Sequence, residues 1–228
     1  MPCPDPVSHM TSGGPSWTDV ATAIGTVGAV VVALFGNFLP RLFPPKLSIA
    51  VVNPRGVRQQ VWLGNIQSGG FVINTTHTSD ARFYQLTVKN SRRWVRAHNV
   101  RAVLQKIEQR TTVGWVEVWS GGGIPLVWQH ESALGTLRTL GPAQLADLFH
   151  VLKDQNAQGT KALVLTPIFG PYGVELARTV ACELRVTVQA ESDEADSAPL
   201  VVTINWDGQW EDGAMEMENH LRLEQATA

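Results

Sequence analysis

The feature that most constrains this chain is a run of twenty-one residues without a charged side chain. It covers residues 20–40, V-A-T-A-I-G-T-V-G-A-V-V-V-A-L-F-G-N-F-L-P, between Asp19 and Arg41. Wound as a helix, such a run rises about 30 Å, which matches the hydrocarbon core of a bilayer. Core helices are seldom this long without a charge, and the preceding residues lack the basic segment of a secretory signal. We therefore predict a single transmembrane helix over residues 17–40.

The charges beside this run predict its orientation. Only Asp5 and Asp19 precede it, whereas several cations follow it closely: Arg41, Lys46, Arg55 and Arg58. Because positively charged flanks stay in the cytoplasm, we expect a single-pass protein of the inner (cytoplasmic) membrane with its N-terminus outside. A disordered tail (1–16) would precede the helix, and a Pro-rich connector (41–46) would join it to a cytosolic domain. Translation from Met1 or from Met10 fits this arrangement equally well.

Small residues recur every four positions along the predicted helix, at Ala21, Gly25, Ala29 and Ala33. This spacing lets two helix backbones approach closely in a membrane. It predicts a packing face for a homo-oligomer. The alternative is that Gly and Ala are simply common in such helices.

The cytosolic part reads as short strands separated by turns. R-F-Y-Q-L-T-V-K, residues 82–89, places Tyr84, Leu86 and Val88 on one face and polar residues on the other, which is the pattern of a half-buried strand. Further strands are predicted at residues 47–52, 61–66, 71–74, 100–107, 114–120, 124–130, 163–166, 180–189, 200–206 and 221–224. About ten strands at this spacing favour an antiparallel, immunoglobulin-like β-sandwich over residues 47–226.

One segment is ambiguous. Leu145, Leu148, Phe149 and Leu152 recur at helical spacing after Pro142, yet the segment lies between strands. Its position favours a strand that begins near Asp147, and the helical alternative stays open.

Charge is divided unevenly along the chain. Residues 41–110 hold twelve Lys or Arg and two acidic residues, whereas residues 111–228 hold six Lys or Arg and sixteen acidic residues. One interpretation places a basic half near anionic lipid. The other, which we favour, is that the two halves interleave in the fold and neutralise each other.

Two stretches support a resemblance: T-S-D-A-R-F-Y-Q-L-T-V-K-N-S-R-R-W-V-R-A-H-N-V (78–100) and N-W-D-G-Q-W-E-D-G (205–213). Placed after one N-terminal span, they resemble an uncharacterised family of bacterial membrane-anchored proteins with a β-rich cytosolic domain. The resemblance covers most of residues 17–225. The family has no assigned activity, so the resemblance implies architecture and bacterial origin and supplies no catalytic residue.

Motifs for enzyme chemistry are missing from the sequence. It contains no G-x-S-x-G, H-E-x-x-H, Walker-type loop or G-x-G-x-x-G after a strand. His77, Ser79 and Asp80 precede a strand, where such residues usually form turns. The predicted function is therefore non-enzymatic, with no catalytic residue and no cofactor.

A metal site and a disulfide are also not expected. Asp207, Glu211 and Asp212 offer oxygen ligands, but their spacing matches no EF-hand, and two D-G pairs indicate turns. Cys3 and Cys182 would lie on opposite sides of the membrane, so no disulfide is expected. Trp115 and Trp119, four apart in one predicted strand, are expected to share a face and to pack in the core or across strands.

The best candidate site is a basic loop with an anion-binding composition: Arg92, Arg93, Trp94, Arg96 and His98. Guanidinium groups bind phosphates through paired hydrogen bonds, and an indole face stacks on a base or an Arg. A nucleotide, a lipid headgroup or an acidic partner would fit. The alternative is a solvated loop with Trp94 in the core.

These observations predict a membrane-anchored sensing or protein-interaction domain that faces the cytosol, in a setting such as bacterial stress response or phage defence. Its expected partners are the lipid bilayer, a second copy and an unknown protein, and no nucleic acid is expected. Two alternatives stay open. One is a structural subunit of a membrane complex, and the other is a nucleotide- or anion-binding effector that oligomerises through its helix.

Overall fold

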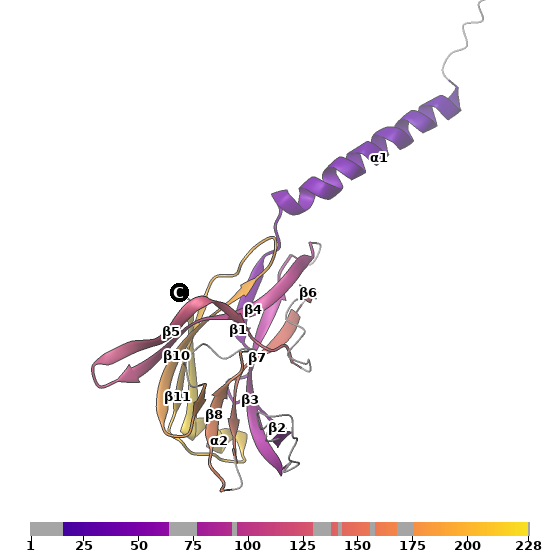
Figure 1. Ribbon diagram of the computed structural model, residues 1–228. Helices are drawn as coiled ribbons and strands as arrows, with labels where there is room; N and C mark the ends of the chain where they lie inside the picture. The colour runs from indigo at the N-terminus through magenta and orange to yellow at the C-terminus, as the bar shows by residue number, and fades with distance from the viewer. Residues whose placement is uncertain are drawn as a thin grey trace, which may run out of the picture. The chain divides into compact units, whose positions relative to one another are not determined.

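The computed structural model describes residues 16–63, 77–92, 95–129, 138–140, 143–155, 158–167 and 176–227. The chain divides into two compact units, Met1–Phe43 and Pro44–Ala228. The first contains the helix α1, and the second contains the β-strands (Figure 1).

The helix α1 spans Trp17–Leu42, so a helix forms where the uncharged run predicts one. Residues 16–33, the part whose side chains the structure describes, are exposed throughout. Among the described residues, no helix combines the length and the apolar character that crossing a membrane requires. The predicted helix is therefore confirmed, and the predicted membrane span is not supported by the described residues.

The β unit consists of two antiparallel sheets. In the first sheet, the order is β1-β3-β7-β8-β9, and β2 pairs with β3 beyond the end of β1. Its strands are β1 (Leu47–Val51), β2 (Val57–Leu63), β3 (His77–Asn90), β7 (Ala143–Leu152), β8 (Ala162–Leu165) and β9 (Ala177–Arg178). The fourteen-residue strand β3 is long enough to pair with both short strands on one side and with β7 on the other.

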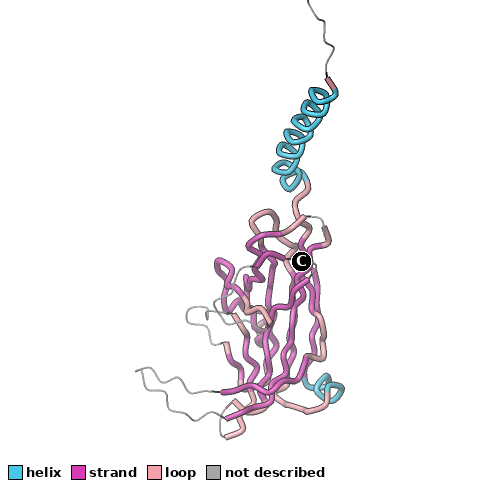
Figure 2. Tube along the Cα trace, turned by 90° about the vertical axis from the view of Figure 1, so that its right-hand side faces the viewer, coloured by secondary structure: helices cyan, strands magenta, loops and turns pink. Residues whose placement is uncertain are grey.

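The second sheet has the order β12-β11-β10-β4-β5, and β6 also pairs with β4. Its strands are β4 (Ala97–Thr111), β5 (Gly114–Pro125), β6 (Arg138–Leu140), β10 (Cys182–Glu191), β11 (Leu200–Trp206) and β12 (Leu221–Thr227). A short helix, α2 (Ala214–His220), leads directly into β12 and lies at one end of the strands (Figure 2). The chain passes from one sheet to the other between β3 and β4, between β6 and β7, and between β9 and β10.

Both sheets contribute to one hydrophobic core. Tyr84 stacks on Phe149 in the first sheet, with ring centroids 4.5 Å apart. Their core partners from the second sheet include Ile107, Val186 and Ile204, which are fully buried. Burial alternates along β10 and β11, as period-two strands with one solvent-facing side require. The predicted mainly β fold with two antiparallel sheets is therefore confirmed.

The ambiguous segment is a strand. β7 begins at Ala143, four residues before the expected start, and lies between β3 and β8. The segment forms hydrogen bonds with β3 on one edge and with β8 on the other, and these bonds favour a strand although the spacing of its leucines also fits a helix.

Other boundaries differ from the sequence prediction. The triplet Gly121–Gly123 does not end β5. It forms a bulge opposite β4, where the register shifts after Ser120, and pairing resumes at Ile124. The helix α2 was not predicted, and it follows the second D-G pair at Asp212–Gly213. The predicted strand at residues 71–74 lies outside the described residues, as does the tail before residue 16.

Candidate functional site

The basic loop between β3 and β4 is shaped by one buried side chain, Asn90. Its carboxamide oxygen accepts hydrogen bonds from the backbone N–H groups of Lys46 (3.2 Å) and Arg92 (3.1 Å). Its Nδ2 donates to the carbonyl of Val95 at 2.5 Å. All three partners are backbone groups, so Asn90 fixes the path of the loop and ties it to the residues that precede β1.

The loop also contacts the residue at which the β unit begins. Arg92 Nη1 donates to the carbonyl of Pro44 at 2.8 Å, and the Ser91 amide donates to the carbonyl of Lys46 at 3.0 Å. Arg96 is exposed. Arg93 and Trp94 lie outside the described residues, so the two alternatives for Trp94 stay predictions.

His98 is held by an acidic loop that follows β10. Glu194 accepts hydrogen bonds from the His98 amide (3.0 Å) and pairs with its ring Nδ1 at 2.5 Å. Partial burial acts to raise the pKa of the Glu194 carboxyl, but the bonds from His98 outweigh it and hold that pKa below its ordinary value. The structure therefore pairs the His98 side chain with a carboxylate, and its place in an anion site stays a prediction.

The same acidic loop lines a polar hollow of about 480 Å³. Asn99, whose φ of 52° is left-handed, donates to Asp193 at 2.6 Å, and Arg101 pairs with Glu191 at 2.8 Å. Carboxylates dominate the lining of this hollow, so it does not suit an anion.

Ion pairs join the basic and acidic halves of the chain. Arg101–Glu191 links residues ninety positions apart, and Arg55 pairs with Glu218 at 2.9 Å. Among the residues that the structure describes, such pairs lie on both sheets. The favoured interpretation, in which the two halves interleave, is confirmed, and it excludes a wholly basic half.

The residues considered for acid–base chemistry make structural contacts. Asp80 pairs with Arg58 at 2.6 Å. The Ser79 hydroxyl accepts a hydrogen bond from the Asp154 amide at 3.0 Å and donates to the Asp80 carbonyl at 3.2 Å. The side chain of His77 lies outside the described residues. The turn-forming interpretation is wrong, because Ser79 and Asp80 lie within the strand β3 and pair with Val61 and Gln60 of β2.

Two of the acidic residues considered for a metal, Asp207 and Asp212, have other partners. Asp207 pairs with His220 at 2.8 Å and accepts from the Gln209 amide at 2.9 Å. Asp212 accepts from Trp210 Nε1 at 2.8 Å, and this bond, with that from Lys153, lowers the pKa of its carboxyl. Within the described part of the chain, no group of three His, Cys, Asp or Glu is placed to hold a metal ion.

A buried arginine that the sequence analysis missed joins β3 to the loop before α2. Arg82 is 2% exposed and donates to the backbone carbonyls of Arg55 (3.2 Å) and Asp212 (2.8 Å). Its guanidinium lies 5.8 Å from the ring centroid of Trp210. The alternation along the strand could have indicated this burial, because Arg82 lies two residues before Tyr84 and four before Leu86, on the same inward face of β3.

The expectation that Trp115 and Trp119 share a face is wrong. A register shift between β4 residues Ile107 and Glu108 pairs Trp119 with the buried Ile107, whereas Trp115 pairs with Arg110. Trp119 therefore packs on the core, and Trp115 faces outward under the guanidinium of Arg185, 4.0 Å from its ring centroid. One extra residue in β5 reverses the alternation.

On α1, the predicted packing face of Ala21, Gly25, Ala29 and Ala33 is exposed within its own unit. A Cβ added at Gly25 would meet nothing within 4 Å. The hydroxyls of Thr22 and Thr26 donate to the carbonyls four residues earlier, at 2.7 and 2.8 Å. Within residues 20–33, the helix surface is thus mainly apolar, and the hydroxyls of Thr22 and Thr26 are bonded to the helix backbone.

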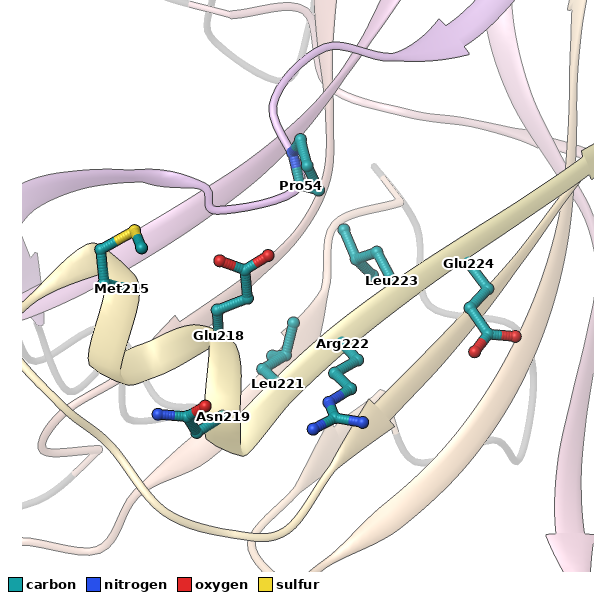
Figure 3. A pocket seen from close by; sticks show the side chains of 8 residues that line it. All are labelled: Pro54, Met215, Glu218, Asn219, Leu221, Arg222, Leu223 and Glu224. Atoms are coloured by element: carbon teal, nitrogen blue, oxygen red, sulfur yellow. The ribbon is translucent and has the colours of Figure 1, made fainter.

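A depression with both apolar and polar lining lies along β12 (Figure 3). It has a volume of about 470 Å³ and runs between Pro54, in the β1–β2 turn, and Leu221 and Leu223 of β12. Met215 and Glu218 of α2 form its end. A smaller hollow of about 180 Å³ continues it and is lined by Val51, Pro54, Leu223 and Gln225. Sequence reasoning did not find this groove, because it is formed by segments about 170 residues apart.

Comparison with known proteins found no match to the chain among protein-family models, curated proteins or solved structures.

Proposed function

We propose that the chain is a membrane-tethered interaction module in which α1 is the anchor and the β unit faces the cytosol. The observation that carries the proposal is α1 itself. Residues 20–40 hold no charge, and its described valines and isoleucine are exposed, with Ile24 at 69% and Val32 at 72%. A helix of 26 residues is about 39 Å long, longer than a hydrocarbon core of about 30 Å. An apolar surface of this kind needs a cover, and lipid supplies one.

The orientation is proposed from the charges on either side of the anchor. Cations follow the helix at Arg41 and Lys46, and the last charge before the uncharged run is Asp19. Positive flanks favour the cytosolic side. Self-association through Ala21, Gly25, Ala29 and Ala33 remains part of the proposal.

We further propose that the basic loop binds anionic lipid headgroups. Arg92 is hydrogen-bonded to Pro44, and Asn90 to Lys46, so the loop lies beside the segment that leads to α1. A tether at that point would hold Arg92 and Arg96 near the membrane surface. Each arginine there contributes about 1 kcal/mol, an amount that orients the β unit and gives only weak, salt-sensitive membrane binding when the anchor is absent.

A lipid headgroup fits this loop better than a nucleotide does. Phosphate binding without shape selection needs only accessible guanidinium groups, and the loop offers the exposed Arg96 and the half-buried Arg92, whose Nη1 is bonded to the Pro44 carbonyl. A nucleotide site would also need convergent backbone donors, yet the Arg92 amide is already bonded to Asn90. The non-enzymatic character of the β unit is part of the same proposal and is supported by the structural contacts of Ser79 and Asp80.

For the fold, we propose that the four central strands are arranged as in an immunoglobulin-like sandwich. The pairs β3–β7 and β4–β10 correspond to the B–E and C–F pairs of such domains. The outer strands differ, because β8 follows β7 in the chain, whereas the strand in that place of an immunoglobulin domain precedes it. The resemblance to a bacterial family stays a prediction.

Two experiments test the proposed function. Reporter fusions after residue 60 and after residue 228 should behave as cytosolic when the chain is expressed in a bacterium, and periplasmic activity at either point contradicts the topology. Extraction of the membrane fraction with alkaline carbonate should leave the chain in the pellet. Its release into the supernatant would contradict the anchor.

The lipid role is tested by flotation of the β unit, residues 44–228, with vesicles. Binding should require anionic lipid, weaken with salt, and be lost in the Arg92→Glu/Arg96→Glu variant. The matched control, Arg110→Glu/Lys161→Glu, makes the same charge change away from the loop and should still bind. Trp94→Ala should leave vesicle binding nearly intact. If the Arg92/Arg96 variant floats as the control does, the loop is not the lipid-binding surface.

A further inference from the structure

The strand β12 leaves a sheet edge open. It is the outermost strand of the second sheet and pairs only with β11 in the described part of the chain. Its register with β11 runs from Leu221 to Thr227 without a bulge. Edge strands are usually protected against pairing by Lys, Pro or a bulge, and β12 has none of these.

The outward backbone groups of β12 can be identified. The Asp207 amide donates to the His220 carbonyl at 3.1 Å, so the backbone of residue 220 faces β11. Backbone direction alternates along an antiparallel strand, so residues 222 and 224 also face β11. The N–H and C=O groups of Leu223 and Gln225 and the C=O group of Leu221 therefore face the open edge, whereas the Leu221 N–H donates to the Met217 carbonyl at the end of α2.

The side chains of β12 sort into two faces (Figure 3). Leu221 is buried and Leu223 packs against the core, on the side of the groove beside Pro54. Arg222 and Glu224 are exposed and project from the opposite face. One cation and one anion thus lie two residues apart on the outer face of an unpaired edge.

We propose that this edge is a homodimer interface, in which β12 of a second copy pairs antiparallel with β12 about a two-fold axis at Leu223. In this register, Arg222 lies opposite Glu224 of the second copy, and Glu224 lies opposite Arg222. Directly opposed charges of unlike sign stabilise an antiparallel pair. The interface is self-complementary, as a two-fold contact requires.

Charge selects this register over its neighbours. The outward-facing N–H and C=O groups of one strand must pair with those of the other, so the two neighbouring two-fold registers are centred on Arg222 or on Glu224. A register centred on Arg222 places Arg222 of one copy opposite Arg222 of the other. A register centred on Glu224 places the two Glu224 side chains opposite each other. Like charges in direct opposition are destabilising, which leaves Leu223 as the favoured centre.

The groove receives the apolar side of the second strand. In the register centred on Leu223, Leu221 and Leu223 of the second copy lie on the face that is bordered by Pro54 and Val51. The contact therefore covers the open edge and fills the apolar part of the depression together. This surface is distinct from α1, and the inference goes beyond the proposed anchoring function.

The test is disulfide cross-linking of the full chain in mild detergent, with Cys3 and Cys182 replaced by serine. At the centre of the pair, two Cα atoms would lie about 5.5 Å apart, which suits a disulfide. Oxidation of Leu223→Cys should give a covalent dimer. The matched control Ala226→Cys should not, because residue 226 would face residue 220 of the second copy. Cross-linking of Leu223→Cys no greater than that of the control overturns the proposal.

Charge variants in the Leu223→Cys background provide the second arm. Arg222→Glu alone, or Glu224→Arg alone, opposes like charges twice and should lower the cross-linked fraction about tenfold. The double variant Arg222→Glu/Glu224→Arg should restore it. Both side chains are exposed, and urea unfolding of each variant checks that the fold is kept. Single variants that cross-link as well as the parent, or a double variant that does not recover, would exclude this register.

Discussion

The burial of His150 predicts an acid-sensitive step in the stability of the β unit. The ring stacks on Phe83, with centroids 5.1 Å apart, and its Nδ1 is buried without a hydrogen-bond partner among the described residues. Burial lowers the pKa of His150 to about 4, from an ordinary value of 6.5. Folding therefore holds this imidazole neutral at pH values where an unfolded chain protonates it.

The sign and size of the effect follow from proton linkage. Above pH 6.5 the ring is neutral in both states and contributes nothing. As pH falls from 6.5 to 4, the unfolded chain gains a proton that the folded chain does not bind, so the free energy of unfolding falls. The loss is about 2 kcal/mol at pH 5 and levels off near about 3 kcal/mol below pH 4.

Urea unfolding of residues 44–228 at pH 7.5 and at pH 5.0 measures this loss. His150→Phe keeps an aromatic ring against Phe83 but cannot titrate, so it should lose about 2 kcal/mol less than the parent between the two pH values. The exposed Val113 supplies the control, because Val113→Thr changes no titrating group and should retain the full loss. Equal losses for the parent and for His150→Phe would refute the reasoning that burial holds this histidine neutral.

Two further predictions concern the contacts that join β3 to its neighbours. Replacing the buried Arg82 with Leu removes the donors to the carbonyls of Arg55 and Asp212 and should destabilise the β unit by about 2–4 kcal/mol in urea unfolding. Arg82→Lys should also be destabilised, because one ammonium group cannot reproduce the planar fork of the guanidinium. Urea unfolding of the Lys variant at the wild-type midpoint would contradict this. Gly56→Ala should lower the free energy of unfolding by about 1–3 kcal/mol, because φ is +66° there and the new Cβ would lie 2.7 Å from Arg82 Cγ. The control Gly122→Ala, with open space around the new Cβ, should unfold at nearly the parent urea concentration. Equal unfolding midpoints for the two variants would contradict the steric argument.

The sequence by itself determined the local and periodic features. The uncharged run predicted the helix α1, because apolar composition and length are properties of a continuous segment. Alternation around Tyr84, Leu86 and Val88 predicted β3 and its inward face, and this face also contains Arg82. Residues 200–206 form a strand with the predicted bounds. In each case one contiguous segment carries the whole signal.

Only the tertiary structure decided the features that depend on partners far away in the chain. Residues 143–152 become a strand because β3 and β8 pair with both edges, although their leucines also fit a helix. The bulge in β5 separates Trp115 from Trp119, and no residue type marks its position in advance. Glu194, ninety-six residues away, forms hydrogen bonds with His98, a partner that the local sequence does not indicate. The groove beside β12 exists because the β1–β2 turn and the last strand, which are distant in sequence, form adjacent edges of the two sheets.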